Sequence, residues 1–467
     1  EKNLMAEGLA HSSKKILEKY EAEIKSHIIA IQEEPRFPYP KPRDYQEEAY
    51  EEWLKSNKKG IFAMATGTGK TLTALNCLLN EFKESGSYQA VVLVPTSALL
   101  EQWHKEIGDF NFKSLLRASS DYSWNQPIDH LNTQLAFDKS VSFIIIATYD
   151  TFASHKFQQK TKNFPDTTLL IADEAHNIGR PKLKELLPTI NYSKRIALSA
   201  TPNRRFDPEG NELIEEFFNS KEPYTYSFSM ERAIKEKILS PYFYYPHIVY
   251  LSRDEMVGYV EISKKIASLY DQVTDSFRNP AVAKKLMQDR SQIIHKAEGK
   301  FGVFQTIINS LVAERGNLEY SFVYVPEGLD SQGNNFLEQY LGFVEKKFPS
   351  VLSHHYTGKT DNRSQVMTAF ENGTIECLFS MKCLDEGVDV PRAEIAVFCS
   401  STGNPRQFIQ RRGRVLRKHE EKDSAIIHDL IVLPVSSGEE GSFKSEKKLI
   451  KDELTRVIYF SSLARNY

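Results

Sequence analysis

Short apolar runs alternate with segments of helical periodicity along most of this chain, and this alternation restricts the possible folds more than any other feature. Five runs lie in the first half: GIFAM (60–64), AVVLV (90–94), FIIIA (143–147), TLLIA (168–172) and RIALS (195–199). Runs that are apolar throughout belong to strands buried on both faces, and the helical stretches between them supply the cover. The pattern predicts an α/β domain built on a parallel sheet.

The same alternation returns in the last third of the chain. The runs there are YSFVYV (320–325), SVLSH (350–354), ECLFS (376–380), EIAVFCS (394–400) and AIIHDLIVL (425–433). Residues of about 252–316 carry helical periodicity with no strand between them. We therefore expect a second parallel-sheet domain, with a helical insertion in it or before it.

The length of 467 residues also requires more than one domain, because a single core stops growing well below this size. Residues 12–34 show helical spacing, and the Pro-rich PRFPYPKPR that follows cannot continue a helix. We expect an N-terminal helical extension at 1–35, a first domain at 36–235 and a second at 236–467. The start at Glu1 without methionine suggests a trimmed chain or part of a longer protein.

Composition excludes several classes of protein. With 40% hydrophobic and 26% charged residues the chain is close to the globular average. Its first residues lack the apolar core of a signal peptide, and no apolar stretch approaches the ~20 residues of a membrane helix. We expect a cytoplasmic protein with no membrane partner, associated with the nucleoid if it is bacterial. The four cysteines form no CxxC pair and indicate no metal site. A net charge of −2 gives no global basic field, although a cleft can be locally basic.

The junction MATGTGKT (64–71) follows the first strand and precedes a helical stretch. Gly67 and Gly69 let the backbone wrap around phosphate oxygens, and the helix that follows presents free N–H groups. Lys70 would neutralise the β and γ phosphates, and the Thr71 hydroxyl would bind Mg²⁺. The stretch predicts an ATP site with Mg²⁺, the alternative being a chance Gly-rich turn.

Two carboxylates and a histidine end the apolar run TLLIADEAHNI (168–178). The simpler interpretation is a polar turn that caps a core strand. Since ligands of parallel sheets bind beyond the carboxyl ends of the strands, these residues can face the same crevice as the Gly-rich junction. Asp173 would then hold Mg²⁺, and Glu174 would polarise the water that attacks the γ phosphate.

A basic segment, QFIQRRGRVLR (407–417), lies near the end of the second domain. Gln410, Arg411, Arg414 and Arg417 recur every three or four residues, so one helical face carries several guanidinium groups. A basic helix on the surface is the simpler interpretation. If this face closed over the nucleotide, its arginines would act as arginine fingers.

Taken together, these stretches resemble a superfamily-two helicase or translocase of the DEAH-box type. The resemblance extends from Arg43 to about Leu433 and keeps the order of the family's motifs. The matching stretches are PRDYQ (42–46, Q motif), MATGTGKT (motif I), VPTSALLEQW (94–103, motif Ia), ATYDTF (147–152), DEAH (173–176, motif II), SAT (199–201, motif III), HHYTG (354–358), SMKCLDEGVDVP (380–391, motif V) and QRRGRVLR (motif VI).

The resemblance implies two RecA-like domains in tandem with ATP in the cleft between them. The residues implied to bind ATP are Arg43, Gln46, Thr66, Gly67, Thr68, Gly69, Lys70, Thr71, Gly387 and Asp389. His176 would couple the ATP site to Ser199, Thr201 and Gln410. Those implied to contact the nucleic-acid backbone are Thr96, Thr148, Tyr149, Thr357 and Gly358. Each contact residue also has a simpler interpretation as a cap or turn residue.

The sequence SATPNRR and the VLR that ends motif VI look like the DNA-acting branch, which includes XPB-like repair helicases, RadD-like proteins and motor subunits of restriction systems. Met64 departs from the strict motif I pattern, and no strand-separating domain is evident. The expected function is an ATP-dependent DNA helicase or duplex translocase in repair, restriction or antiviral defence, with a nuclease or another subunit as a partner. Two alternatives stay open: an RNA helicase, and a nucleotide-gated DNA clamp or scaffold.

Overall fold

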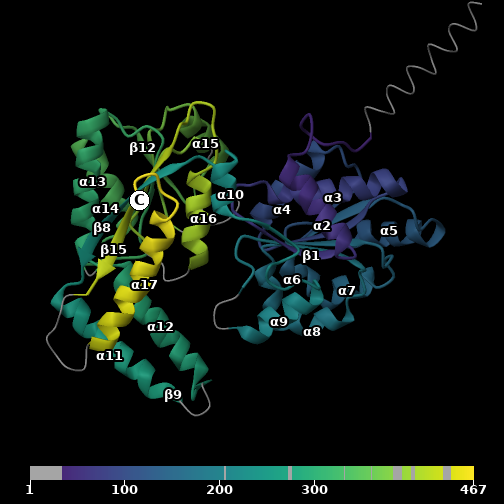
Figure 1. The fold of residues 1–467 in the computed structure, drawn as a ribbon, viewed down its shortest axis with the longest axis horizontal. Coiled ribbons are helices and arrows are strands. Elements are labelled where there is room, and N and C mark those ends of the chain that lie inside the picture. Colours follow the sequence, from purple (N-terminus) through teal and green to yellow (C-terminus); the bar gives the residue numbers. More distant parts are fainter. Residues whose placement is uncertain are drawn as a thin grey trace, which may run out of the picture. The chain divides into compact units, whose positions relative to one another are not determined.

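The computed structural model describes residues 34–203, 207–271, 276–330, 332–358, 360–381, 392–400, 405–434 and 443–467. These residues form two compact units, and the chain passes from the first to the second between Ser227 and Phe228. The short segment Met64–Thr68 groups with the second unit. Each unit holds one large sheet flanked by helices (Figure 1).

Within the described residues, the sheet of the first unit has seven strands in the order β3-β4-β2-β5-β6-β1-β7. Their bounds are β1 Lys59–Met64, β2 Gln89–Val94, β3 Leu115–Ala118, β4 Phe143–Thr148, β5 Leu169–Asp173, β6 Lys194–Ser199 and β7 Tyr226–Phe228. Strands β1 to β6 all run parallel, which confirms the predicted sheet. The periodicity did not indicate β3 and β7, because such short strands carry little apolar pattern.

Helices cover both faces of this sheet. Their bounds are α2 Asp44–Lys55, α3 Lys70–Ser85, α4 Ser97–Asp109, α5 Asn125–Phe137, α6 Tyr149–Phe152, α7 His155–Thr161, α8 Pro181–Leu186 and α9 Pro208–Phe217. Helices α3 and α4 contact the central strands on one side. On the other side Ile128 of α5, Phe157 of α7 and Ile214 of α9 join a buried cluster with Val91 and Ile145 of the strands.

The register of the central strands brings their carboxyl ends level with one another. Ala63 of β1 pairs with Ser199 of β6, and Val94 of β2 pairs with Thr148 of β4. Asp173 is the last residue of β5, between β2 and β6. The segments that follow β1, β2, β4, β5 and β6 therefore emerge at one edge of the sheet, where parallel α/β folds bind their ligands.

The described part of the second unit has a six-stranded sheet in the order β12-β13-β11-β14-β15-β8, and every neighbouring pair is parallel. The strand bounds are β8 Tyr242–Tyr250, β11 Ser321–Tyr324, β12 Ser353–Tyr356, β13 Cys377–Ser380, β14 Ile395–Phe398 and β15 Ala425–Leu433. The predicted second parallel sheet is confirmed.

Helices also cover the second sheet. Their bounds are α10 Met230–Lys235, α13 Gly299–Arg315, α14 Phe336–Lys347, α15 Arg363–Glu371, α16 Pro405–Val415 and α17 Phe443–Ser461. Phe304 of α13 and Tyr340 of α14 lie in one buried cluster with the strand residue Phe379. Elsewhere Phe460 of α17 stacks on Tyr244 of β8, with ring centroids 5.2 Å apart.

The helical insertion lies between β8 and β11. Helices α11 (Arg253–Leu269) and α12 (Pro280–His295) pack against each other, and both α11, through Met256 and Tyr259, and α13 contribute to the core of the second unit. The expectation that this region contains no strand is wrong, because β9 (Tyr270–Asp271) and β10 (Ser276–Phe277) pair as an antiparallel hairpin. Strands of two residues are too short to show a period of two.

Two further strands differ from the predictions. The run at 350–354 marks β12 too early, because Val351 packs into the core ahead of the strand and the paired residues begin at Ser353. Strand β8 was not predicted at all. It is an edge strand and contains Pro246, which lacks an N–H and is tolerated at an edge but weakens the strand pattern.

Two expectations from composition can be compared with the described residues. Cys77, Cys377 and Cys399 are unpaired and fully buried, as expected of small core residues, and Cys383 lies outside the described residues. In the part of the chain that the structure describes, no helix has the length and apolar character to cross a bilayer.

Candidate functional site

The loop after β1 has the backbone geometry of a phosphate cradle. Gly67 and Gly69 adopt positive φ angles of 85° and 77°, which side chains other than glycine rarely adopt. The Thr68 hydroxyl donates a hydrogen bond of 2.7 Å to the Ala65 carbonyl and fixes the turn. Helix α3 begins at Lys70, so its unsatisfied N–H groups lie directly after the loop. The local geometry suits an anionic oxygen at the helix N-terminus.

Two of the residues predicted to bind ATP, Arg43 and Gln46, lie beside this loop. The backbone N–H of Arg43 donates to Gln46 Oε1 at 2.9 Å, in a capping box at the start of α2. Gln46 is buried, and a Cβ placed on Gly69 would lie 3.5 Å from its Nε2. The two segments are thus neighbours, although ATP binding by Arg43 and Gln46 stays a prediction.

Asp173 is a buried carboxylate held by two hydrogen bonds. Trp103 Nε1 donates to Oδ2 at 2.8 Å, and the backbone N–H of Glu174 donates to Oδ1 at 2.9 Å. Burial raises the pKa of Asp173, and Lys70 and these two donors partly offset that rise. Hard oxygen donors of this kind suit Mg²⁺, and Thr71 at the start of α3 supplies a hydroxyl. The described residues contain no cluster of three or more His, Cys, Asp or Glu side chains able to hold a metal, and binding of Mg²⁺ by Thr71 and Asp173 stays a prediction.

Glu174 adopts a left-handed backbone conformation, with φ 47° and ψ 54°. For a residue other than glycine this costs about 1–2 kcal/mol, and such strain gathers at functional sites. The next histidine, His176, places Nδ1 3.5 Å from the Glu174 carboxylate, a contact that is attractive when the ring is protonated. The conformation turns the chain sharply at the end of β5, immediately after Asp173.

The predicted coupling residues Ser199 and Thr201 follow the neighbouring strand β6. Ser199 is fully buried, and its Oγ accepts a hydrogen bond of 3.1 Å from the Thr201 N–H. They emerge at the same sheet edge as His176. Their coupling to His176, and that of Gln410, stays a prediction.

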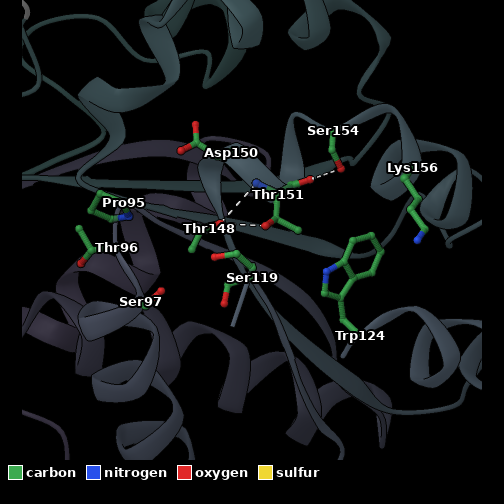
Figure 2. Close-up of a pocket in the computed structure, with 11 residues that line it drawn as sticks. Pro95, Thr96, Ser97, Ser119, Trp124, Thr148, Asp150, Thr151, Ser154 and Lys156 are labelled. Atoms are coloured by element: carbon green, nitrogen blue, oxygen red, sulfur yellow. Dashed lines mark hydrogen bonds between the residues drawn. The ribbon is translucent and has the colours of Figure 1, made fainter. Parts of the chain in front are cut away.

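A pocket of about 580 Å³ lies at the other end of this edge, beyond β2, β3 and β4 (Figure 2). Its lining is mostly small and hydroxyl-bearing: Pro95, Thr96, Ser97, Ser119, Ser120, Trp124, Thr148, Asp150, Thr151, Ser154 and Lys156. The 13-residue helix α4 begins here, capped by Thr96, whose Oγ1 accepts from the Leu99 N–H at 3.3 Å. Hydroxyls, a lysine and a helix N-terminus form a surface suited to phosphate groups.

The structure distinguishes the predicted nucleic-acid contacts in this pocket. Thr96 and Thr148 cap helices, as the simpler interpretation held, and both also line the pocket. The prediction for the Tyr149 side chain is wrong. Its ring is only 1% exposed, and its hydroxyl donates a hydrogen bond of 2.6 Å to the Asp173 carbonyl. A side chain packed into the core cannot contact a nucleic acid on the surface.

The basic segment of the second unit forms α16, and two of its arginines are committed to packing within that unit. Arg411 donates to the Ser400 hydroxyl at 2.7 Å. Arg412 is fully buried, with its guanidinium 4.4 Å from the ring centroid of Tyr459. Lys422 donates to the Arg417 carbonyl at 3.1 Å, and burial lowers the pKa of Lys422 to about 7. The roles of Gln410, Arg414 and Arg417 at the nucleotide stay predictions.

The remaining predicted site residues also belong to the second unit. The Thr357 N–H donates to Thr360 Oγ1 at 2.7 Å, and open space surrounds the position of a Cβ on Gly358. Gly387 and Asp389 lie outside the described residues.

Two family models match the chain, one in each unit. The model of the type III restriction enzyme res subunit matches residues 39–204, and that of the helicase conserved C-terminal domain matches residues 329–419. The chain belongs to the superfamily-two helicases. This superfamily-two helicase is accordingly an ATP-hydrolysing enzyme, and its fold consists of two RecA-like domains.

Relatives of this superfamily-two helicase cover most of its length. The DNA 3'-5' translocase XPB2 of Sulfurisphaera tokodaii is 27% identical over 397 residues, covering 82% of this chain and 80% of that protein. A putative DNA 3'-5' helicase Rad25 of Haloarcula marismortui is 24% identical, over 80% of this chain and 50% of that protein. This chain therefore spans about half the length of the Haloarcula protein.

Solved structures show the same fold. The Pyrococcus furiosus Hef helicase domain superimposes with a TM-score of 0.52 and 16% identity, over 87% of this chain and 98% of that chain. The type ISP restriction-modification enzyme LlaBIII bound to DNA gives a TM-score of 0.59 at 17% identity, over 90% of this chain and 30% of that chain. At such identities the likeness shows the fold alone.

The sequence did not predict three residues of this helicase's site, namely Trp103, Trp124 and Lys156, and it predicted a different role for Tyr149. Trp103 and Tyr149 hold Asp173, and Trp124 and Lys156 line the pocket. Trp103 ends the stretch that resembles motif Ia, and its place in that motif was the one signal in the sequence. Trp124 and Lys156 lie outside the quoted motifs, and no local pattern marked them.

Proposed function

We propose that this enzyme uses ATP hydrolysis to translocate along DNA, and that it contacts the DNA backbone through the pocket of its first unit. The observation that carries the proposal is the arrangement of one sheet edge. The nucleotide-binding segments follow β1, β5 and β6, and the polar pocket lies beyond β2, β4 and β3 of the same sheet. A conformational change at the nucleotide can therefore be transmitted through the sheet to the groups that contact the nucleic acid.

The residues around Asp173 fit a nucleotide with Mg²⁺. Thr71 and Asp173 would hold the ion, which when bound neutralises charge on the transferred phosphoryl group. Lys70, next to the loop, would contact the same phosphates. Its charge already favours the ionised form of Asp173, since it lowers that pKa against the effect of burial. The glycines at 67 and 69 allow the backbone N–H groups to approach the phosphates closely.

Glu174 is the proposed general base. Its backbone adopts the left-handed conformation at the end of β5, and His176 Nδ1 lies 3.5 Å from its carboxylate. Its carboxylate would orient the attacking water and accept its proton, an effect that typically contributes 10²–10⁴-fold to the rate. His176 would couple this carboxylate to Ser199 and Thr201.

DNA is the proposed track because a relative that aligns over 82% of this chain and 80% of its own length carries the name of a DNA translocase. Hydroxyl contacts with phosphates carry no sequence information, so binding should be indifferent to sequence and sensitive to salt. Repair, restriction or antiviral defence, and a nuclease or other subunit as partner, belong to the same proposal.

The test is an ATPase assay with single-stranded DNA, duplex DNA and RNA at one salt concentration, followed by displacement of a third DNA strand from a triplex. We expect DNA to raise kcat and the enzyme to displace the third strand only while ATP is hydrolysed. Stronger stimulation by RNA would indicate an RNA helicase. ATP-dependent binding without displacement would indicate a clamp, and turnover indifferent to every nucleic acid would refute the proposal.

A further inference from the structure

One end of the first-unit pocket carries an aromatic side chain and a cation. Trp124, which precedes α5, and Lys156 of α7 both line the pocket, and Lys156 Nζ lies 5.8 Å from the centroid of the indole ring. Figure 2 shows the indole beside Thr151, on the opposite side of the pocket from Pro95 and Thr96. The ring is partly buried and packs against Phe157, with centroids 5.6 Å apart. The platform is thus held by the core, and part of it is open to the pocket.

This tryptophan differs from the other two in the chain. Trp53 and Trp103 are at most 1% exposed, and each indole N–H has an acceptor: the Arg195 carbonyl at 3.0 Å and the Asp173 carboxylate at 2.8 Å. Within the described ranges, the side chains of Trp124 and Lys156 form no hydrogen bond or ion pair. Tryptophan N–H groups normally find a partner, so Trp124 retains a free donor and a free part of its ring.

The chemistry of this corner differs from that of the rest of the pocket. The hydroxyl wall from Thr96 to Ser154 suits phosphate oxygens, but an indole offers them little beyond one N–H. A flat aromatic ring matches the π-face of a nucleobase, and stacking tolerates any base. The exposed ammonium of Lys156 can contact the adjoining phosphate. The volume of about 580 Å³ is within the range that holds small-molecule ligands and accommodates an unstacked nucleotide.

We propose that Trp124 is a stacking platform for one unpaired base of the DNA strand, with Lys156 on the neighbouring phosphate. The inference rests on the proposed function, because it needs a nucleic acid in the pocket. A base can stack on a side chain only when it has left the duplex stack. The enzyme therefore holds a single-stranded segment here, and Trp124 favours single-stranded over duplex DNA.

The first experiment measures tryptophan fluorescence of the wild-type protein at fixed salt. One titrant is a short oligodeoxynucleotide, and the other is a phosphodiester oligomer of equal length that lacks bases. Because the other two tryptophans are buried, quenching by a stacked base should come from Trp124. We expect the oligodeoxynucleotide to quench and the abasic oligomer to bind with little quenching. Equal quenching by both would overturn the proposal.

The second experiment uses variants and the ATPase assay. Trp124→Ala should raise the single-stranded DNA concentration for half-maximal stimulation about tenfold or more, while the concentration of abasic oligomer for half-maximal stimulation changes less than about twofold. Trp124→Phe should recover most of the loss while removing the quenching signal, and it keeps the contact with Phe157. A shift of equal size for both titrants would reveal a merely structural role.

Lys156→Gln tests the phosphate contact. It should reduce the slope of log affinity against log salt by about one unit, whereas Lys162→Gln, an exposed lysine just beyond the same helix, should not. Failure of this inference can be told from failure of the proposed function. Suppose that DNA stimulates the wild type, but Trp124→Ala and Trp124→Phe need the same concentrations of both titrants as the wild type for half-maximal stimulation. Then only the inference fails. If no nucleic acid stimulates the wild type, the proposed function fails first.

Discussion

The indole N–H of Trp103 donates a hydrogen bond of 2.8 Å to the carboxylate of Asp173. Trp103 belongs to α4, whose capping residue Thr96 lines the pocket. Tyr149 of α6 donates to the Asp173 carbonyl at 2.6 Å, and the capping residue of α6, Thr148, lines the pocket as well. Two helices that border the proposed DNA pocket are thus bonded to the proposed metal-binding residue. In a close-packed unit, this gives the two sites a shared mechanical frame.

Trp103→Phe should impair catalysis more than its effect on folding explains. The change removes a hydrogen bond to a charged group, which is worth ~1.5–3 kcal/mol, so we expect kcat to fall about tenfold or more. The matched control is Trp53→Phe. Trp53 is equally buried, but its indole N–H donates a hydrogen bond of 3.0 Å to the Arg195 carbonyl, which is not part of the proposed nucleotide site. Steady-state ATPase kinetics and thermal melting of both variants test this. Equal loss of kcat in the two variants would contradict it.

Tyr149→Phe should reduce the stimulation by DNA while basal ATPase changes little. The substitution keeps the ring packed but deletes the bond to the Asp173 carbonyl, so α6 loses its link to β5. A neutral hydrogen bond of this kind contributes about 1 kcal/mol, which predicts a stimulation factor several-fold lower. Tyr192→Phe, a second buried tyrosine of the first unit, is the control. An unchanged ratio of stimulated to basal kcat would show that the bond carries no coupling.

Variants of Glu174 should separate activity from stability. Glu174→Gln keeps the side-chain volume but removes the base, and kcat should fall about 10²–10⁴-fold. Glu174→Gly should be as inactive, yet more stable than Glu174→Gln by about 1 kcal/mol, because glycine adopts the left-handed conformation without strain. Glu185→Gln, at an exposed position nearby, should behave like the wild type. Normal turnover in Glu174→Gln would remove Glu174 from the mechanism.

Arg412 should matter for packing between α16 and α17. Its guanidinium is buried among aromatic rings and donates to the Tyr459 carbonyl at 3.1 Å and the Tyr242 hydroxyl at 3.2 Å. Arg412→Ala should lower the free energy of unfolding by about 2–4 kcal/mol, through a cavity and lost cation–π contact. Arg412→Met should restore most of it, because the thioether fills the space against the rings. Denaturant unfolding, with exposed Arg253→Ala as control, tests this; a neutral alanine variant would contradict it.

Acid should destabilise the second unit through His428. Burial lowers its pKa to about 3, and His247, bonded to it at 2.9 Å, adds a smaller effect. The unfolded chain, with a histidine pKa of about 6.5, then binds more protons than the folded protein over the interval between these values. The free energy of unfolding therefore falls as pH drops from about 6.5 towards 3, by at most ~1.4 kcal/mol per unit for this group.

Denaturation midpoints measured at about pH 7 and pH 5 test this expectation. His428→Phe should flatten the dependence, while His130→Gln, at an exposed position of α5, should leave it unchanged. The same slope in His428→Phe as in the wild type would assign the acid sensitivity to other groups.

The sequence by itself determined the features that depend on local pattern. Uninterrupted apolar runs between helical stretches determined two parallel sheets, because only strands covered on both faces need that composition. The sequence also indicated the loop with Gly67 and Gly69, because glycine has a freer backbone, and the polar turn at Glu174, because charged residues end the apolar run. Both properties act locally. Strands with polar or interrupted patterns, such as β8 with Pro246, were not predicted, because they lack an uninterrupted apolar run.

Only the tertiary structure decided which residues meet across long stretches of chain. Trp103 reaches Asp173 from a helix distant in sequence, Tyr149 is directed into the core, and Trp124 approaches Lys156 at the pocket. Arg412, which belongs to a basic helix by sequence, is packed among aromatic rings. These contacts depend on how strands order themselves in a sheet and how helices settle on it. The free energy of that packing is shared by residues far apart in the chain, so no local pattern records it.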